Sequence, residues 1–405
     1  MQKKKKQKKW MKFRHRVVRN IAFCILYPYS RMKYGIKVEK FREQGDRPYL
    51  ILFNHQTAFD QFFVGMAFRG PVYYVASEDL FSMGWVSKLI RWAVAPIPIK
   101  KQTTDLNAVM TCIRVAREGG TIAIAPEGNR TFSGETVYMS DAIAPLAKKL
   151  KLPIALYRLE GGYGVQPRWS DEVRKGKMRG YVAHVIEPEE YAAMSNEELF
   201  ARIKEQLYVN EANDNHRFRS ERQAEFLERA LYVCPDCGFV KLESHGNEIH
   251  CTKCGKTFVH GEDKRITGKG FASPFPFVKQ WYDYQQKLVN ELDVSAWYDT
   301  PVFTDTADLS EVVIYQDKKP MEQGVAVSLY GNRITLAGKA DTWEFPFEEV
   351  SAVTVLGKNK LNIYHNKRVY QLKSDERFNA LKYVNLFHRY KNVMKGEENG
   401  EFLGL

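Results

Sequence analysis

The chain has 405 residues, of which 44% are hydrophobic and 27% are charged. This length favours two or three domains, and the composition excludes a disordered or fibrous protein. The formal net charge of +13 would indicate a nucleic-acid or membrane partner, but ten Lys and Arg residues and no acid lie within residues 1–20, which leaves +3 for the rest. The excess charge therefore belongs to one terminal segment.

The basic segment also carries an apolar stripe. Apolar side chains recur there every three or four residues, namely at Trp10, Phe13, Val17, Ile21 and Cys24. This spacing predicts an amphipathic helix. The longest apolar run, residues 21–27, is far below the ~20 residues of a membrane span, and no small-residue cleavage site of a signal peptide follows. Residues 1–34 are therefore expected to lie on an anionic membrane surface, with a disordered basic tail or a nucleic-acid arm as alternatives.

A polar motif follows the next apolar run. Residues 49–53 predict a buried strand, and Asn-His-Gln-Thr-Ala-Phe-Asp comes directly after it. His55 would lie at the strand end, and Asp60 in the following helix, where its carboxylate can accept the N–H of one ring nitrogen. The other nitrogen is then a base near neutral pH that can deprotonate a substrate hydroxyl. The alternative is a core histidine bonded to a neighbouring side chain.

A second polar motif follows a second predicted strand, residues 121–125, and begins at Pro126. Gly128 lets the backbone approach a ligand closely, and Arg130 can bind a phosphate through two N–H groups. An ordinary turn with a surface arginine is the alternative. Two motifs at the ends of two strands in one domain favour a shared site.

Strands and helices alternate through this part of the chain. Strands are also expected at residues 72–76, 154–159 and 181–186, and helices at residues 81–94, 103–118, 141–151 and 195–208. Such alternation predicts an α/β fold, in which the sheet is mostly parallel but mixed.

The polar motifs resemble those of the glycerolipid acyltransferases of the PlsC type. That family has Asn-His, four variable residues and Asp, then a Gly/Pro-rich segment ending in a basic residue, then Glu-Gly-Thr-Arg and a Pro-led strand. The corresponding blocks stand here in the same order, at residues 54–60, 95–101, 126–130 and 152–156. Asn129 replaces the usual Thr or Ser, and Lys101 replaces the usual Arg, which keeps the charge but loses the bidentate fork.

The resemblance covers about the first half of the chain and implies an acyltransferase domain at residues 35–209. The implied reaction transfers an acyl group from acyl-CoA or acyl carrier protein to a lysophospholipid, with 1-acylglycerol-3-phosphate as the first choice of acceptor and phosphatidic acid as product. Another lysophospholipid or glycerol phosphate is the alternative acceptor. His55 would take the proton of the acceptor hydroxyl, and Asp60 would fix the ring tautomer. The acceptor's glycerol phosphate would be held by Lys101, Glu127, Gly128, Asn129 and Arg130.

Two Cys-x-x-Cys pairs, each followed by Gly, are separated by thirteen residues in the segment 232–260. The four cysteines are Cys234, Cys237, Cys251 and Cys254. This spacing is typical of a zinc ribbon, and four thiolates complete a tetrahedral structural site. Disulfides are the alternative, disfavoured because Cys24 and Cys112 occupy isolated apolar positions.

Linker helices are expected on both sides of the ribbon, within residues 210–231 and 261–300. A domain over residues 301–395 follows, and residues 396–405 form a tail. In the domain over residues 301–395, seven strands are expected before a helix at 376–390. The strands cover residues 312–315, 325–330, 333–336, 342–345, 350–355, 361–364 and 369–372. This order resembles a pleckstrin-homology-like or GRAM-like β-barrel, which implies a lipid head group or a protein as partner.

Two other function classes are weighed against the enzyme. A membrane scaffold with an inactive acyltransferase domain is disfavoured because the motif residues are intact, and a nucleic-acid-binding protein is disfavoured because the charge outside the tail is near neutral. The sequence thus predicts a peripheral or monotopic enzyme on the cytoplasmic face of the membrane, without a spanning helix.

Overall fold

The computed structural model describes residues 9–99, 105–136, 138–213, 216–313 and 315–397. The chain forms two compact units. Unit 1 comprises Met1–Glu127, Met139–Glu160 and Met178–Tyr208, and unit 2 comprises Gly128–Tyr138, Gly161–Lys177 and Val209–Leu405. Two segments that the sequence analysis assigned to the acyltransferase domain are therefore grouped with the C-terminal half.

Unit 1 is built on a seven-stranded sheet. Its strands, in spatial order, are β1 (Ile36–Val38), β7 (Met178–Ile186), β6 (Ile154–Glu160), β2 (Leu50–Phe53), β5 (Thr121–Ile124), β3 (Val72–Ser77) and β4 (Ile97–Ile99). Neighbouring strands are parallel except β6 and β7. The predicted mostly parallel, mixed sheet is confirmed. The strand expected at 181–186 is an interior strand, because β1 pairs along its outer side.

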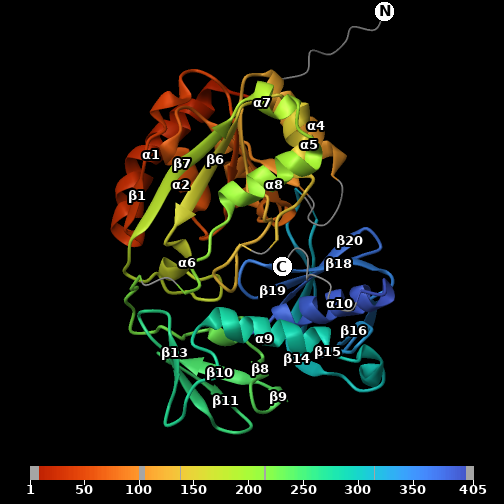
Figure 1. Cartoon of the computed structure of the whole chain (residues 1–405). Coiled ribbons are helices and arrows are strands. Elements are labelled where there is room, and N and C mark those ends of the chain that lie inside the picture. The colour runs from red at the N-terminus through yellow and green to blue at the C-terminus, as the bar shows by residue number, and fades with distance from the viewer. Residues whose placement is uncertain (1–8, 100–104, 137, 214–215, 314, 398–405) are drawn as a thin grey trace, which may run out of the picture. The chain divides into compact units, whose positions relative to one another are not determined.

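Helices cover both faces of this sheet (Figure 1). The helices of unit 1 are α1 (Phe13–Tyr34), α2 (Asp60–Ala67), α3 (Trp85–Val94), α4 (Leu106–Arg117), α5 (Ile143–Leu150), α7 (Pro188–Ala192) and α8 (Asn196–Leu207), with short 3-10 helices at Arg42–Gln44 and Glu78–Phe81. Tyr157 of β6 donates to the Phe63 carbonyl of α2, and its neighbour Leu156 packs in the apolar cluster of α4, α5 and α8. The alternation along β6 thus gives each face its own helices. Helix α8 begins with a capping box between Ser195 and Glu198.

The N-terminal helix α1 continues through Pro28 to Tyr34, and Gly35 ends it in the left-handed conformation. Arg19 fastens α1 to the end of α2 by donating to the carbonyls of Gly65 and Phe68. Within the described part of the chain, no helix has the length and apolar content that crossing a membrane requires.

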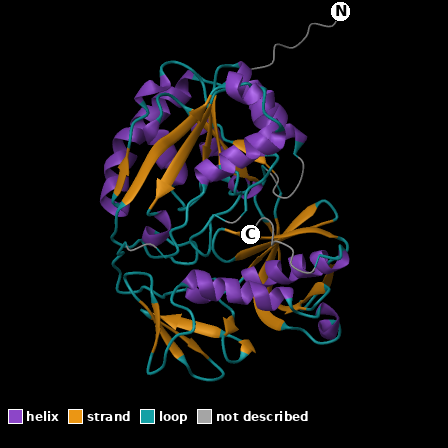
Figure 2. Ribbon diagram, viewed as in Figure 1, coloured by secondary structure: helices purple, strands orange, loops and turns teal. Residues whose placement is uncertain are grey.

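Unit 2 contains three antiparallel sheets (Figure 2). The hairpin β8 (Val233–Cys234) and β9 (Gly238–Phe239) precedes a four-stranded sheet of β10 (Leu242–His245), β11 (Glu248–Cys251), β12 (Thr257–His260) and β13 (Ile266–Gly268). Helix α9 (Val278–Asn290) leads to a 3-10 turn at Val294–Trp297 and then to a seven-stranded sheet, which helix α10 (Leu381–Met394) follows. The last sheet comprises β14 (Phe303–Glu311), β15 (Lys319–Leu329), β16 (Arg333–Ala337), β17 (Thr342–Pro346), β18 (Val350–Leu356), β19 (Lys360–His365) and β20 (Arg368–Lys373). Helix α6 (Gly162–Val165) also belongs to this unit.

Two predicted elements are wrong. The charged helix expected within residues 217–231 is an irregular segment with one 3-10 turn, Leu227–Arg229. Phe218 fills a space over two glycines there, since a Cβ on Gly164 or Gly176 would lie 2.2 Å from its ring. This tertiary packing outweighs helix propensity. The strand expected at 312–315 lies instead at β14, whose polar residues alternate with buried ones and so hide the strand from a search for apolar runs.

One apolar core runs through unit 2. It joins residues of the cysteine-bearing hairpins, α9, the seven-stranded sheet and α10. It also includes Phe132 from the segment 128–138 and Trp169 from the segment 161–177, both almost completely buried. These two segments therefore depend on the C-terminal half for the burial of Phe132 and Trp169.

Candidate functional site

The strand β2 brings the first motif to the carboxyl end of the sheet. It lies between β5 and β6 and is parallel to both, so the residues after Phe53 emerge at the edge where α/β sheets place ligand sites. Asn54 is buried and bonds twice to Leu159 of β6, donating to its carbonyl at 2.8 Å and accepting from its N–H at 2.7 Å. These two hydrogen bonds fix the backbone from which His55 projects.

Asp60 opens helix α2 and is completely buried. Its carboxylate accepts from His55 Nδ1 at 2.7 Å, from the Gln56 N–H at 2.6 Å, and from the N–H and hydroxyl of Thr57 at 2.9 and 2.6 Å. A buried carboxylate is stable only with such donors, and an ionised one can only accept. His55 Nδ1 is therefore the ring nitrogen that donates to Asp60, and in the neutral ring Nε2 is the acceptor, on a side chain that is 26% exposed. The structure thus brings His55 and Asp60 together as predicted.

Glu127, the first acid of the second motif, follows β5 and is buried in unit 1. The backbone N–H of His55 donates to its Oε1 at 2.9 Å. Burial raises the pKa of Glu127 to about 8, the His55 N–H opposes this shift, and the charge of Asp60 adds to it. At neutral pH, Glu127 therefore mostly holds a proton, and in this structure it ties the end of β5 to the end of β2.

The rest of the second motif belongs to unit 2. Gly128 is exposed with a φ of 70°, in the left-handed region, and a Cβ there would meet open space. The positive φ of this turn by itself favours glycine at this position. Asn129 is half-buried, and Arg130 is buried with its backbone carbonyl bonded to Arg168. Lys101 lies outside the described residues.

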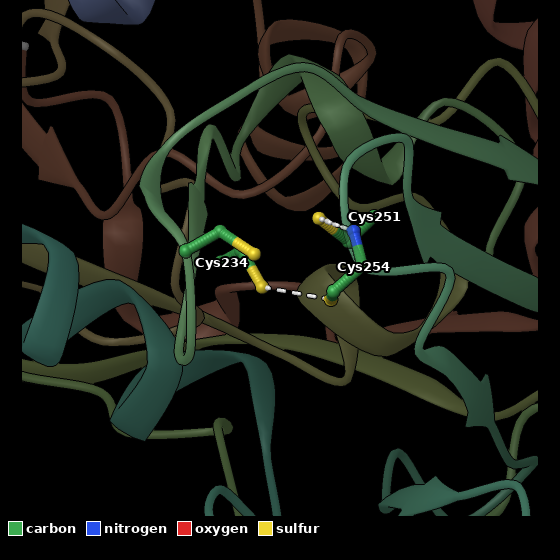
Figure 3. A group of neighbouring side chains, drawn as sticks. Cys234, Cys251 and Cys254 are labelled. Atoms are coloured by element: carbon green, nitrogen blue, oxygen red, sulfur yellow. Dashed lines mark hydrogen bonds between the residues drawn. The ribbon is translucent and has the colours of Figure 1, made fainter.

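The four predicted ribbon cysteines come together in unit 2, and Figure 3 shows three of them, Cys234, Cys251 and Cys254. Their sulfur atoms all lie within 4.8 Å of one another, and the Sγ atoms of Cys234 and Cys254 are 3.8 Å apart. A tetrahedral centre with metal–sulfur bonds of about 2.3 Å requires a separation of about 3.8 Å. The N–H groups of Lys253 and Cys254 point at the sulfur of Cys251, at 3.4 and 3.5 Å. All six cysteines are free of disulfides, and these four could bind a metal ion.

Helix α9 is hydrogen-bonded to the residues that precede Cys234. Trp281 donates to the Val233 carbonyl at 2.7 Å, and Gln285 accepts from the Tyr232 N–H at 2.8 Å and donates to the Ala230 carbonyl at 3.1 Å. Helix α9 therefore holds residues 230–233, which lead directly into Cys234. The histidines of this region are not members of the cluster.

Sequence reasoning missed two residues that shape these sites. Thr57 supplies two of the donors to Asp60, and its Thr-x-x-Asp spacing is the capping-box pattern that could have revealed it. Arg168, which holds the carbonyl of Arg130, lies 38 residues further along the chain and carries no local pattern that could have indicated it.

Residues 35–156 match the Acyltransferase family. This segment contains His55, Asp60 and Glu127, and the match supports acyltransferase activity.

Three single proteins are similar to parts of the chain. The 1-acyl-sn-glycerol-3-phosphate acyltransferase of Bacillus subtilis (strain 168) is 23% identical over 176 residues, which are 43% of this chain and 84% of that protein. The crystal structure of the 1-acyl-sn-glycerophosphate (LPA) acyltransferase PlsC from Thermotoga maritima aligns with a TM-score of 0.39 and 20% identity, over 47% of this chain and 78% of that one. The N-terminal PH domain of human ARAP2 aligns with a TM-score of 0.17 and 16% identity, over 23% of this chain and 80% of that one.

The raised pKa of Glu127 predicts a pH-dependent stability. Between its usual pKa of 4.5 and the folded value of about 8, the folded state binds a proton that the unfolded state lacks. The free energy of unfolding should therefore fall as the pH rises through this window, by at most about 1.4 kcal/mol per pH unit from this group. Glu127→Gln keeps an acceptor for the His55 N–H but cannot ionise, so its stability should fall less steeply between pH 5 and 8 in urea denaturation.

The control is Glu205→Gln, on an exposed position of α8, which should keep the slope of the unmodified protein. Equal slopes for Glu127→Gln and the unmodified protein would show that Glu127 does not hold an extra proton.

Proposed function

We propose that the protein esterifies a lysophospholipid with an acyl group from a thioester of coenzyme A or acyl carrier protein. The proposed acceptor is 1-acylglycerol-3-phosphate and the product phosphatidic acid, which would place the enzyme in phospholipid biosynthesis. The observation that carries the proposal is the His55–Asp60 pair, held at 2.7 Å within the segment that matches the Acyltransferase family. The name of the Bacillus relative supports the choice of acceptor.

In the proposed mechanism, His55 is the general base. Its Nε2 takes the proton of the acceptor hydroxyl while that oxygen attacks the thioester carbonyl, and the thiolate that leaves takes the proton back. Asp60 keeps the proton on Nδ1 and stabilises the imidazolium that forms, as four hydrogen bonds hold its carboxylate in a fixed orientation. No covalent enzyme intermediate is needed.

We propose that Arg130 binds the phosphate of the acceptor and that Lys101 adds a second positive charge. A guanidinium can form two parallel N–H bonds to a phosphate, which gives direction as well as charge. Glu127, Gly128 and Asn129 would shape the loop that presents Arg130, since Glu127 anchors its start to the His55 backbone.

The assignment of Arg130 is tested by acceptor preference. Arg130→Ala should lower the ratio of kcat/KM for lysophosphatidate to that for monoacylglycerol by about 10- to 100-fold, because two charge-assisted hydrogen bonds to the phosphate are lost. Arg130→Lys should give a smaller decrease, since the charge remains without the fork.

Arg202→Ala is the control, as this arginine forms a surface pair with Glu190 at 3.1 Å. It should leave the ratio unchanged. An unchanged ratio in Arg130→Ala as well would remove Arg130 from the acceptor site and, with it, the main support for a phosphate-bearing acceptor.

We propose that α1 and α3 attach the enzyme to the anionic, cytoplasmic face of a membrane. The two helices contact each other, and Arg14 of α1 donates to the Trp92 carbonyl of α3 at 2.8 Å. Both expose large apolar side chains, among them Phe13 at 81% and Trp85 at 73%. Apolar side chains flanked by basic residues are typical of helices that lie in the plane of the lipid surface.

The contribution of the basic tail can be tested by removing residues 2–9, which hold six lysines. The deletion must end before Trp10, because the N–H groups of Trp10 and Met11 donate to the Glu118 carboxylate at 3.0 and 2.9 Å. Each basic residue near an anionic surface is worth about 1 kcal/mol, so sedimentation with phosphatidylserine-containing vesicles at low salt should weaken strongly. Replacing the six lysines by arginine should preserve binding. Equal binding after the deletion would refute the tail as an anchor.

We propose a structural zinc ion bound by Cys234, Cys237, Cys251 and Cys254. The four sulfurs have the spacing of a tetrahedral site, and the chemistry of four thiolates suits zinc. Metal analysis of the purified protein should find about one zinc per chain, and Cys251→Ser should lose it and lower the melting temperature. Cys24→Ser, which alters an exposed cysteine of α1, should keep both. A metal-free native protein with the same melting temperature would contradict the site.

The seven-stranded sheet and α10 support a pleckstrin-homology-like domain, although β14 lies before the predicted first strand. Its strand order is β17-β16-β15-β14-β20-β19-β18, with every neighbouring pair antiparallel and α10 against β18. We propose that this C-terminal barrel contacts a lipid head group or a protein.

A further inference from the structure

Arg168 is a buried arginine that no motif indicated. Its side chain, in the segment 161–177 of unit 2, is only 1% exposed. Its guanidinium donates to three backbone carbonyls, those of Arg130 at 2.8 Å, Val355 at 2.9 Å and Gly357 at 2.9 Å, and lies 4.2 Å from the ring centroid of Phe132. One side chain thus joins the Arg130 loop, its own segment and the turn between β18 and β19.

None of these partners neutralises the charge of Arg168. Removing a guanidinium from water is costly, and an apolar side chain of similar volume would fill the same space without that cost. The three carbonyls are bonded to three different nitrogens, however, and only a guanidinium offers N–H donors on three nitrogens in one fixed planar fork. The arginine is therefore suited to fixing three backbone segments at once.

Further contacts hold the same segment to the same turn. Asp171, three residues after Arg168, forms ion pairs with Lys358 of the β18–β19 turn and with Arg229, the latter at 2.9 Å. Arg229 also donates to the Trp169 carbonyl at 2.9 Å. The turn is thus bound both to Arg168 and to Asp171, three residues further along the chain, which gives the segment a second attachment beside the guanidinium that holds Arg130.

Positive charge accumulates around this turn. Burial, and then the charge of Arg130, lowers the pKa of Arg168 to about 9. Burial lowers the pKa of Lys358 as well, against the opposing effect of Asp171 and with the help of the charges of Arg130 and Arg229. Arg130, Arg168, Arg229 and Lys358 thus lie close enough for their charges to act on one another, and Asp171 bonds to Arg229 and Lys358.

We infer that Arg168 is a positioning residue that fixes the Arg130 loop against the β18–β19 turn, and that the C-terminal barrel thereby takes part in recognition of the acceptor phosphate. The inference rests on the proposed role of Arg130. It assigns the barrel a function in catalysis beyond the binding of a separate partner, because the turn holds the backbone of a residue that binds substrate.

The test compares Arg168→Met and Arg168→Lys with Arg174→Met in the full-length protein. Arg174 is a matched control, since it is equally buried in the same segment but donates to the Gln223 carbonyl and lies over the Trp169 ring. For each variant, kcat, the KM of lysophosphatidate, monoacylglycerol and the acyl donor, and the melting temperature are measured.

Arg168→Met should raise the KM of lysophosphatidate about tenfold or more, because a small displacement of a binding group is costly, and leave the KM of monoacylglycerol and of the donor within about twofold. Arg168→Lys should show part of the same effect, while Arg174→Met should not change the preference between the acceptors. If Arg168→Met does not fold, Lys358→Ala in the β18–β19 turn should raise the lysophosphatidate KM in the same selective way.

Equal changes for both acceptors and the donor, or the same selective change in Arg174→Met, would reduce Arg168 to a purely structural residue and overturn the inference. If Arg130→Ala alters acceptor preference but neither the Arg168 variants nor Lys358→Ala do, only this inference fails. If Arg130→Ala itself has no effect on preference, the proposed acceptor contact fails first.

Discussion

A carboxylate removed from water must be surrounded by hydrogen-bond donors, and Asp60 meets this requirement with four. Three of them come from Gln56 and Thr57, so the same carboxylate shapes the turn after β2 and opens α2. The fourth is His55 Nδ1, whose tautomer and orientation follow. The reactive nitrogen of the proposed base is thus determined by the electrostatics of one buried side chain, while Asn54 and Glu127 fix the backbone around it.

Buried charges also hold unit 2 together, but there the buried charges are positive. Arg168 satisfies its N–H groups with backbone carbonyls, and Arg229 binds both a carbonyl and Asp171. These contacts, together with Phe132 and Trp169 in the common apolar core, join two segments from the first half of the chain to the C-terminal half. The segment 128–138, which carries Arg130, is therefore packed with the C-terminal half of the chain.

The features that could be predicted from the sequence are local. Apolar runs indicated β2, β5 and β6, the five-residue spacing indicated the His55–Asp60 bond, and the paired cysteines indicated their own cluster, because each pattern lies within a few residues or a known loop length. Contacts between distant segments left no such pattern. The role of Arg168, the packing of Phe218 over Gly164, and the assignment of residues 128–138 to unit 2 depend on tertiary structure that no short window contains.

The central claim is that His55 acts as the base in acyl transfer to a lysophospholipid. It is tested most directly by incubating the purified protein with lysophosphatidate and an isotope-labelled acyl thioester, and by identifying labelled phosphatidic acid by mass spectrometry. The account predicts product with the unmodified protein and a rate lower by about 10²- to 10⁴-fold in folded His55→Ala. A nearly unchanged rate in folded His55→Ala, or no acyl transfer to any lysophospholipid by the unmodified protein, would contradict it.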